Sequence, residues 1–408
     1  MADLNQPLVA TTPSKWVVES KVFGNLPDYG VPLLESMMAR NLAVLLKQRE
    51  ANNEYGMFNY GDWNFFMGGT AHKWGNLQYD TAYTLFVQFA RSGDRSFFDA
   101  AEAAIKHAMD VDIEHFRPEM PNWEGANYAY GEGNPDHIFN PGLWHIYTEG
   151  FISHYVMTGD RRGLEVAQKI ADWCCHIADN YADQGTHRGY LRKAEERETA
   201  LPLMALAAVY SVRRDERYLR AMKKLVQHAR DWQAQNGTWD VPVSSEGPAS
   251  FMMGILMEAL RKYYDVSGDE SVVPMVTRAS DALLSPTFWA PNEKDGDADG
   301  LIARPLLSRT AKYTGGISAL TAPYLGDAYS WTNDPRYLKK AARLMMPALM
   351  DTAYIGKQVG QNGRSAARFS YWWEAYAKTL PTHPEVSLLC HLENAADIAF
   401  PTYGRGGA

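Results

Sequence analysis

The chain is poor in cysteine and in long apolar runs. Its 408 residues include three cysteines, of which Cys174 and Cys175 are adjacent, so no disulfide framework is expected. The longest strongly apolar stretch, ALPLMALAAVY at 200–210, is too short to span a bilayer. The opening sequence MADLNQPLVATTPSKW lacks the charged start and apolar run of a signal peptide. We therefore expect a cytoplasmic protein without a membrane partner.

Positive charge and metal-binding motifs are also scarce. The net charge is −8 and the pI about 5.8, which argues against a nucleic-acid partner, although a locally basic cleft is compatible with it. Neither HExxH nor CxxC occurs, so we expect no bound metal and no cofactor. The composition, 46% hydrophobic and 22% charged, is that of a globular protein with a large core.

A degenerate repeat organises the chain. It occurs as SGDRSFFDAA, TGDRRGLEVA, RRDERYLRAM, SGDESVVPMV and TNDPRYLKKA. Each copy follows a helix end rich in aromatic residues and precedes an apolar helix, and its aspartate can cap that second helix. The capping aspartates are Asp94, Asp160, Asp215, Asp269 and Asp334. The repeat therefore predicts helical hairpins, each with a short turn.

Five helical pairs follow from this repeat. They are 76–91 with 95–110, 142–158 with 161–180, 198–213 with 216–234, 249–266 with 270–285, and 315–331 with 335–352. Helices at 31–50 and 366–379 complete a sixth pair, and a short terminal helix is expected near 386–398. We predict an all-α fold, an (α/α)6 barrel, as a single domain over 1–408 with residues 1–30 as an N-terminal extension.

The two ends of such a barrel differ. The short turns close one end, whereas long loops at 52–75, 111–141, 181–197, 235–248, 286–314 and 353–365 gather at the other. Long loops on a rigid scaffold usually carry the functional site. We therefore expect the site at the loop-rich end.

The first candidate cluster stands before the first inner helix, where His72, Trp74, Asn76, Gln78 and Asp80 crowd together. The simpler interpretation is that Asn76 caps the helix and Trp74 staples it. The functional interpretation is that an aromatic plane beside amides and carboxylates binds a sugar. His72, Trp74 and Asn76 are then substrate-binding candidates and Asp80 is a catalytic candidate.

The second cluster lies in NPGLWHIYTEG at 140–150. His145 and Glu149 are four residues apart and would share one face of a helix opened by Pro141 and Gly142. They are either an ordinary intrahelical pair or an acid/base pair on the barrel lining.

A third group, HAMDVDIEHF at 107–116, mixes histidines and carboxylates. Solvated charge at a helix end explains it more simply than a metal site. Asp112 remains a catalytic candidate and His115 a substrate-binding one.

The basic segments are RPLLSRTAKYTGG at 304–316 and NGRSAARF at 362–369. Arginine binds carboxylates in a planar fork, so arginines at loop ends facing a cleft suggest an anionic sugar, with surface solvation as the alternative. The substrate-binding candidates here are Arg304, Arg309, Lys312, Tyr313, Arg364 and Arg368.

The segments WGNLQYDTAYTLFVQFARSGDRSFFDAAEAAIKHAMDVDIEH and HIYTEGFISHYVMTGDRR resemble the helical catalytic region of YetA-like exo-rhamnogalacturonan lyases, over roughly residues 58–173. The resemblance implies an (α/α) barrel and uronate-containing glycans, with Trp74, Asn76, Asp80, His145 and Glu149 as site candidates. Gln78, Tyr83 and Tyr147 depart from the family pattern. Related single-domain (α/α) barrels include β-glucuronidases and unsaturated glucuronyl hydrolases.

The reaction stays open at this stage. A hydrolase needs two carboxyl groups, which the loop-rich end supplies amply, whereas a lyase needs a base and positive charge, which His145, Tyr313 and Arg304 could provide. We favour an exo-acting, β-glucuronidase-like glycoside hydrolase of uronate-containing oligosaccharides. A lyase acting by β-elimination, a sugar epimerase and a non-catalytic scaffold are the alternatives. A homo-oligomer is compatible with the sequence.

Overall fold

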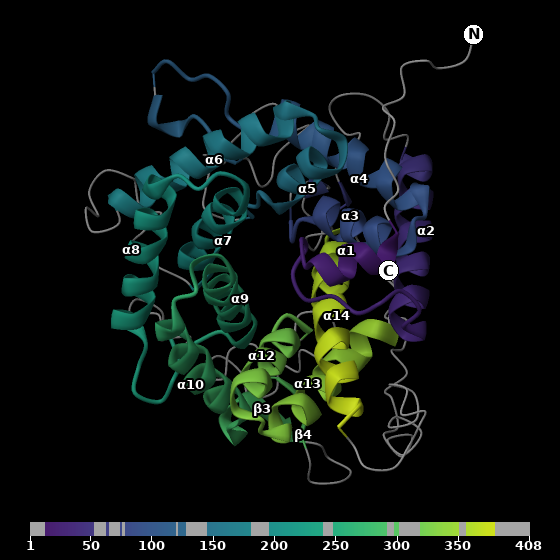
Figure 1. Ribbon diagram of the computed structural model, residues 1–408, viewed down its shortest axis with the longest axis vertical. Helices are drawn as coiled ribbons and strands as arrows, with labels where there is room; N and C mark the ends of the chain where they lie inside the picture. The colour runs from purple at the N-terminus through teal and green to yellow at the C-terminus, as the bar shows by residue number, and fades with distance from the viewer. Residues whose placement is uncertain are drawn as a thin grey trace, which may run out of the picture.

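The computed structural model describes residues 13–52, 63–64, 74–75, 78–119, 121–127, 145–180, 196–239, 248–291, 298–301, 319–350 and 356–379. Two rings of helices make up most of this part of the chain (Figure 1). The inner helices are α3 (Thr81–Ser92), α5 (Glu149–Thr158), α7 (Glu196–Val212), α9 (Ser250–Ser267), α12 (Ala322–Thr332) and α14 (Gly356–Ala377). The outer helices are α2 (Pro32–Asn52), α4 (Arg95–His107), α6 (Arg161–Asp179), α8 (Glu216–Trp232), α10 (Val273–Leu284) and α13 (Pro335–Met350).

The inner ring closes on itself. Each inner helix packs against the next in chain order, and α14 packs against α3. The outer helices α4, α6, α8, α10 and α13 each contact two successive inner helices. The predicted (α/α)6 barrel is therefore confirmed.

The burial pattern separates the two rings. Outer helices such as α8 bury one stripe, with Tyr218, Met222 and Leu225 inward. The inner helix α7 is apolar over nearly its whole length, and thirteen of its residues are buried. An inner helix is covered by outer helices on one side and by side chains of the other inner helices on the other. It therefore needs no face exposed to solvent.

The repeat aspartates cap the second half of each hairpin: four stand directly before the second helix, and Asp269 caps the 3-10 turn Glu270–Val272 that leads into α10. Each carboxylate accepts a hydrogen bond of 2.8–3.0 Å from the backbone N–H two residues later. Gly93, Gly159 and Gly268 have positive φ angles and end the preceding inner helices, as the SGD and TGD sequences require. The predicted capping role is confirmed.

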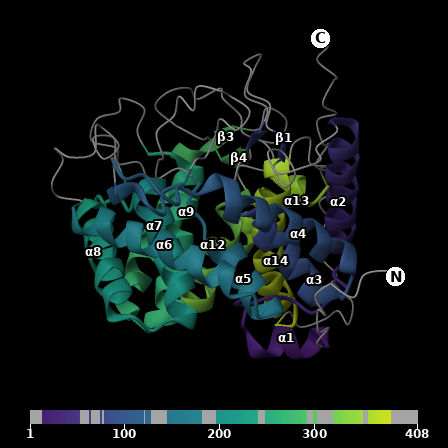
Figure 2. The same cartoon turned by 90° about the horizontal axis from the view of Figure 1, so that it is seen from above.

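The remaining elements are short. Figure 2 shows α1 (Ser14–Ser20) at one end of the barrel and β1 (Trp63–Asn64), β3 (Trp289–Pro291) and β4 (Ala298–Leu301) at the opposite end. β1 pairs with β2 (Trp74–Gly75), and β3 with β4, both antiparallel. The single-turn elements are η1 (Ala108–Asp112, a π-helix), η2 (Pro121–Trp123), η3 (Glu270–Val272) and η4 (Pro286–Phe288). None of the described helices combines the length and the apolar character needed to cross a membrane.

Four predicted helix starts are wrong. α3 begins at Thr81 with Asp80 as its N-cap, so Asn76 does not cap it. α5 begins at Glu149 rather than at 142, α12 at Ala322 rather than at 315, and α14 at Gly356 rather than at 366. The helix expected near 386–398 lies outside the described residues.

Candidate active site

A buried ionic cluster lies in the barrel lumen. We call Glu149, Glu258, Lys262 and Arg364 the lumen cluster. Arg364 Nη2 lies 2.6 Å from Glu149 Oε2, and its Nε donates to Glu258 Oε1 at 3.1 Å. Lys262 Nζ donates to Glu149 Oε1 and lies 3.7 Å from Glu258 Oε1. The four side chains are at most 16% exposed.

The helices that carry these residues show that the cluster lies inside the inner ring. Glu149 comes from α5, Glu258 and Lys262 from α9, and Arg364 from α14. Each pair of these three helices is separated by another inner helix in the ring, so side chains from all three meet only inside it. The two carboxylates and two cations balance in charge, which is how buried charges are tolerated.

Asp80 adjoins this cluster. One carboxylate oxygen accepts from the backbone N–H of Tyr83 at 3.1 Å and the other from that of Gly150 at 2.9 Å, so Asp80 joins the first turns of α3 and α5. Burial, and after it the charge of Glu149, raises the pKa of Asp80 to about 6. Burial alone would raise the pKa of Glu149 as well, but Arg364 and Lys262 outweigh it and lower that pKa to about 2. The pKa values of two neighbouring carboxyl groups are thus shifted in opposite directions.

Backbone strain gathers at the same place. Tyr79, Asp80 and His145 have φ angles of 56°, 48° and 63°, a left-handed conformation that is costly for residues other than glycine. The other such residues in the described chain, Lys21 and Asn333, only end helices. The rings of Tyr79 and His145 meet edge to face at 5.8 Å. Such strain tends to persist where a site needs a fixed geometry.

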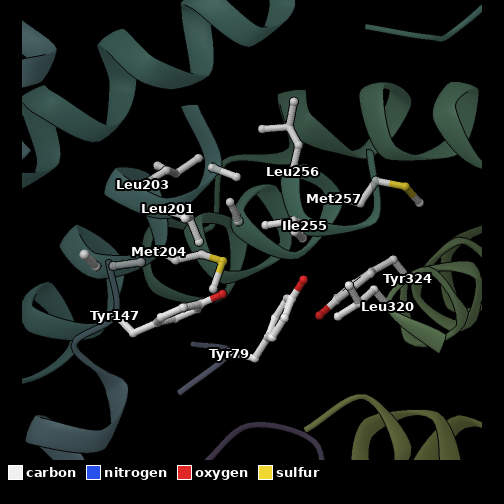
Figure 3. Close-up of a cluster of buried hydrophobic side chains, with 14 of the residues drawn as sticks. Tyr79, Tyr147, Leu201, Leu203, Met204, Ile255, Leu256, Met257, Leu320 and Tyr324 are labelled. Carbon is white, nitrogen blue, oxygen red and sulfur yellow. The ribbon is translucent and has the colours of Figure 1, made fainter. Parts of the chain in front are cut away.

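Tyrosines line the lumen around the cluster. Figure 3 shows the side chains of Tyr79, Tyr147 and Tyr324 converging beside apolar residues of α7 and α9. The guanidinium of Arg364 lies 5.3 Å from the ring centroids of both Tyr83 and Tyr147. Burial raises the pKa of Tyr83, Tyr147 and Tyr324, so these hydroxyl groups stay protonated at neutral pH.

A second ionic cluster lies on the same helices, toward the short-turn end. Arg261 and Asp265 of α9, Asp327 of α12 and Arg368 of α14 form what we call the base cluster. Asp327 Oδ1 accepts from Arg261 Nη1 at 3.2 Å, from Arg368 Nη2 at 3.4 Å and from Trp372 Nε1 at 3.0 Å. Arg261 also pairs with Asp265 at 2.8 Å.

A cavity borders the lumen cluster. Its lining includes Phe23 and Asn25 of the segment before α2, Tyr83 of α3, and Lys262 and Arg364. Its free space of about 30 Å³ holds at most two or three water molecules, since each needs roughly 10–15 Å³. The cavity is too small for a sugar ring.

Several predicted residues are not brought together as expected. His145 precedes α5, so it does not share a helical face with Glu149, because the chain turns left-handed there before the helix begins. Arg364 and Arg368 do not stand at a loop end. They lie inside α14 and are paired with internal carboxylates.

Asp112 and His115 follow the outer helix α4. Asp112 Oδ1 lies 3.6 Å from His107 Nε2, and His115 Nε2 contacts the carbonyl of Met109 at 2.6 Å. The same stretch supports the site indirectly, because Ile113 pairs with Asn127, whose Nδ2 donates to the His145 carbonyl at 3.1 Å.

Six predicted residues lie outside the described part of the chain: His72, Asn76, Arg304, Arg309, Lys312 and Tyr313. Of Trp74 only the backbone, in β2, is described. In the described ranges, no group of three or more His, Cys, Asp or Glu residues could hold a metal ion.

Glu258 and Lys262 were missed by the sequence prediction. A signal was present, since they stand four apart in FMMGILMEALRKYYDV, where the surrounding residues are buried on all sides of the helix. Charged residues in such a helix need partners inside the protein.

Two family models match parts of the chain. Residues 6–120 match the PcRGLX-like protein C-terminal alpha/alpha toroid domain, and residues 131–240 match the beta-L-arabinofuranosidase GH127 catalytic domain. Each covers well under half of the chain. The toroid match supports the helical barrel that the resemblance implied. A search of curated proteins finds no match.

Solved structures resemble nearly the whole chain. An unsaturated glucuronyl hydrolase specific for heparin is 10% identical, with a TM-score of 0.59 over 86% of this chain and 100% of that one. A sugar epimerase from a ruminal bacterium is 13% identical, with a TM-score of 0.57 over 85% and 100%. A polysaccharide lyase is 12% identical, with a TM-score of 0.55 over 86% and 99%. At these identities the likeness shows the fold alone.

Proposed function

We propose that this protein is a carbohydrate-active enzyme that hydrolyses a glycosidic bond, with Asp80 as the proton donor. The observation that carries the proposal is the pair of adjoining carboxyl groups with opposite pKa shifts, Asp80 near 6 and Glu149 near 2. Glycoside hydrolysis needs one protonated and one ionised carboxyl group, and their environments assign the two roles.

In this reaction Asp80 donates its proton to the glycosidic oxygen as the bond from that oxygen to the anomeric carbon breaks. Glu149 stays ionised over the working pH range and stabilises the positive charge that develops on the sugar ring. Arg364 and Lys262 keep Glu149 ionised and fixed. A water molecule then supplies the hydroxyl group on the anomeric carbon, and its remaining proton goes to the Asp80 carboxylate, which restores the proton donor.

β-Elimination is the second candidate, favoured by His145. Its strained backbone and its buried ring beside Tyr79 suit a base that removes a proton from a sugar carbon. The tyrosines argue against a phenolate base, because burial raises the pKa of Tyr147 and Tyr83. Tyrosine hydroxyl groups that stay protonated can donate hydrogen bonds but cannot serve as the base.

The substrate we propose is the end of a uronate-containing oligosaccharide, as for a β-glucuronidase. The heparin-specific glucuronyl hydrolase among the structural neighbours is consistent with it. The charges of Arg364 and Arg368 are already balanced by internal carboxylates. We therefore propose the uronate partner among Arg304, Arg309 and Lys312, which carry the basic segment of the sequence.

The test is incubation with matched aryl glucuronides and glucosides and with uronate oligosaccharides. Mass spectrometry should detect the addition of water, without the ultraviolet absorbance that an unsaturated product brings. We expect at least a ~10-fold preference in kcat/KM for the glucuronide, equivalent to about 1.4 kcal/mol. A rising ultraviolet signal on a saturated substrate would favour the lyase, and conversion of free sugar alone would favour an epimerase. Equal rates on the glucoside would remove the uronate proposal but leave the hydrolase.

A further inference from the structure

The segment before α2 is built into the barrel. We call Lys21–Val31 the N-terminal strap. Arg91, whose side chain is fully buried near the end of α3, donates to the carbonyls of Pro27 at 3.1 Å and Asp28 at 3.0 Å. Its Nη2 also lies 2.7 Å from Glu35 Oε1, in the first turn of α2. The strap is therefore fixed at the short-turn end, where α3 ends and α2 begins.

The strap also reaches inward. Phe23 and Asn25 line the cavity beside Lys262 and Arg364, and the carbonyl of Phe23 accepts from the Tyr83 hydroxyl at 3.3 Å. The residues 1–30, expected as an extension, thus include a part that lines the cavity beside the lumen cluster.

Tyr83 is the link between the strap and the lumen cluster. Its hydroxyl binds the strap, while Lys262 Nζ lies 5.5 Å and the Arg364 guanidinium 5.3 Å from the centroid of its ring. Cations at such distances from an aromatic face are held electrostatically. These two cations are also the partners of Glu149.

We infer that Tyr83 is a positioning residue through which the N-terminal strap holds Lys262 and Arg364 against Glu149. The inference deepens the proposed hydrolase site and depends on it for its effect on turnover, but the coupling itself is structural. The strap is then a part of the site, although it is fixed at the short-turn end of the barrel.

A substrate-free measurement tests the coupling. Acylation of individual lysines by an amine-reactive ester, read by mass spectrometry, reports how well Lys262 is protected, with exposed Lys224 as the reference in the same sample. Tyr83→Leu removes both the ring and the hydrogen bond and should speed modification of Lys262 at least ~10-fold. Tyr83→Phe keeps the ring and should speed it by about 2–10-fold, the range of one lost hydrogen bond.

Two further variants keep the test sharp. Tyr263→Phe makes the same chemical change at a tyrosine whose hydroxyl donates to Asp269 at 2.9 Å, away from the strap, and should leave Lys262 protected. Glu35→Gln weakens the hold of Arg91 on α2 without touching Tyr83. It should increase both hydrogen exchange in the strap and modification of Lys262, and it serves if Tyr83→Leu does not fold.

Turnover separates positioning from packing. If the hydrolase proposal holds, Tyr83→Phe should lower kcat by about 2–10-fold with KM within about twofold, because no substrate contact is lost. Unchanged protection of Lys262 in folded Tyr83→Leu, or faster strap exchange in Glu35→Gln without faster modification, would overturn the coupling. Loss of Lys262 protection in a protein that cleaves no glycoside would instead support the coupling and reject the proposed function.

Discussion

The lumen cluster and the base cluster are made of the same parts but differ in their electrostatics. Each has two carboxylates and two cations, and each uses two residues four apart on α9 and one arginine of α14. In the lumen cluster Arg364 approaches Glu149 to 2.6 Å and Lys262 is close as well. In the base cluster the arginines stay 3.2–3.4 Å from Asp327.

The difference appears in the ionisation of the buried carboxyl groups. The close cations lower the pKa of Glu149 to about 2, whereas burial raises the pKa of Asp327 in spite of Arg368 and Arg261. The lumen cluster adjoins a further carboxyl group, Asp80, and residues with left-handed backbone. Similar composition therefore does not imply similar electrostatics, and the proposed function places the chemistry at the lumen cluster.

The largest effect on stability should come from removing the α14 arginine of each cluster. Arg364→Met leaves Glu149 and Glu258 buried with fewer partners and should lower the free energy of unfolding by about 3–5 kcal/mol. Arg368→Met should cost about 1–3 kcal/mol, since Asp327 keeps Arg261 and the Trp372 N–H. Urea unfolding of both variants measures the difference, and equal losses would mean that the two clusters are equivalent.

Activity should distinguish the clusters next. Asp80→Asn removes the proposed proton donor and should lower kcat at least ~100-fold, or about 2.7 kcal/mol in the barrier. Asp327→Asn, at an equally buried aspartate with a raised pKa, should keep kcat within about threefold. Circular dichroism establishes that both variants fold. Similar turnover in the two would remove Asp80 from the proposed mechanism.

The pH dependence gives a third contrast. Because the protonated form of Asp80 is the active one, kcat/KM should fall as pH rises through about 6. A raised carboxyl pKa adds stability below the ordinary value of 3.8, and this contribution is lost as pH rises to about 6. The contribution of Glu149, with its lowered pKa, has the opposite sign and is lost only as pH falls from 4.5 toward 2.

Of the contributions of Asp80 and Glu149, that of Asp80 therefore dominates the change between pH 4.5 and 6, and comparison with Asp80→Asn separates it from the other titrating groups. The wild-type free energy of unfolding should fall over this range by about 2 kcal/mol relative to Asp80→Asn, at 1.36 kcal/mol per pH unit. Denaturant titrations of both proteins at several pH values test this. If the unfolding free energies of the two proteins changed in parallel with pH, the fall in kcat/KM near pH 6 would have to come from a group other than Asp80.

The smallest effect belongs to the turns. Asp94→Ala removes the hydrogen bond to the Ser96 N–H and should cost about 0.5–2 kcal/mol of stability. Turnover on a glycoside should stay within about twofold, because the cap only supports α4. A large loss of activity in a stable Asp94→Ala protein would contradict the separation of site and turns.

The repeat predicted the fold well because its signal is local. A capping aspartate and a glycine with positive φ are decided within a few residues, and they mark most hairpins correctly. The start of α14 was missed because GKQVGQNGR reads as a loop. Its glycines serve packing instead, since a Cβ on Gly360 would meet Thr81, and one on Gly363 would meet Thr84 and Met38.

The site was only partly predictable. Asp80 and Glu149 stood out as carboxylates in unusual company, but their neighbours come from α9 and α14, more than a hundred residues away. The left-handed turn at His145 also hid the true start of α5. Such pairings depend on ring closure, which no local pattern reports.

Closure of the inner ring has a consequence for how the chain is made. Thr84, near the start of α3, donates to the carbonyl of Gly360 in α14, so the first complete hairpin finds its last neighbour some 276 residues later. Until the ribosome has released α14, the apolar sides of α3 and α12 face no partner, and contacts so distant in sequence form slowly. During synthesis the ring of helices is thus incomplete and exposes an apolar surface at each of its two ends. Chaperones that cover such surfaces would act during the last stage of its synthesis.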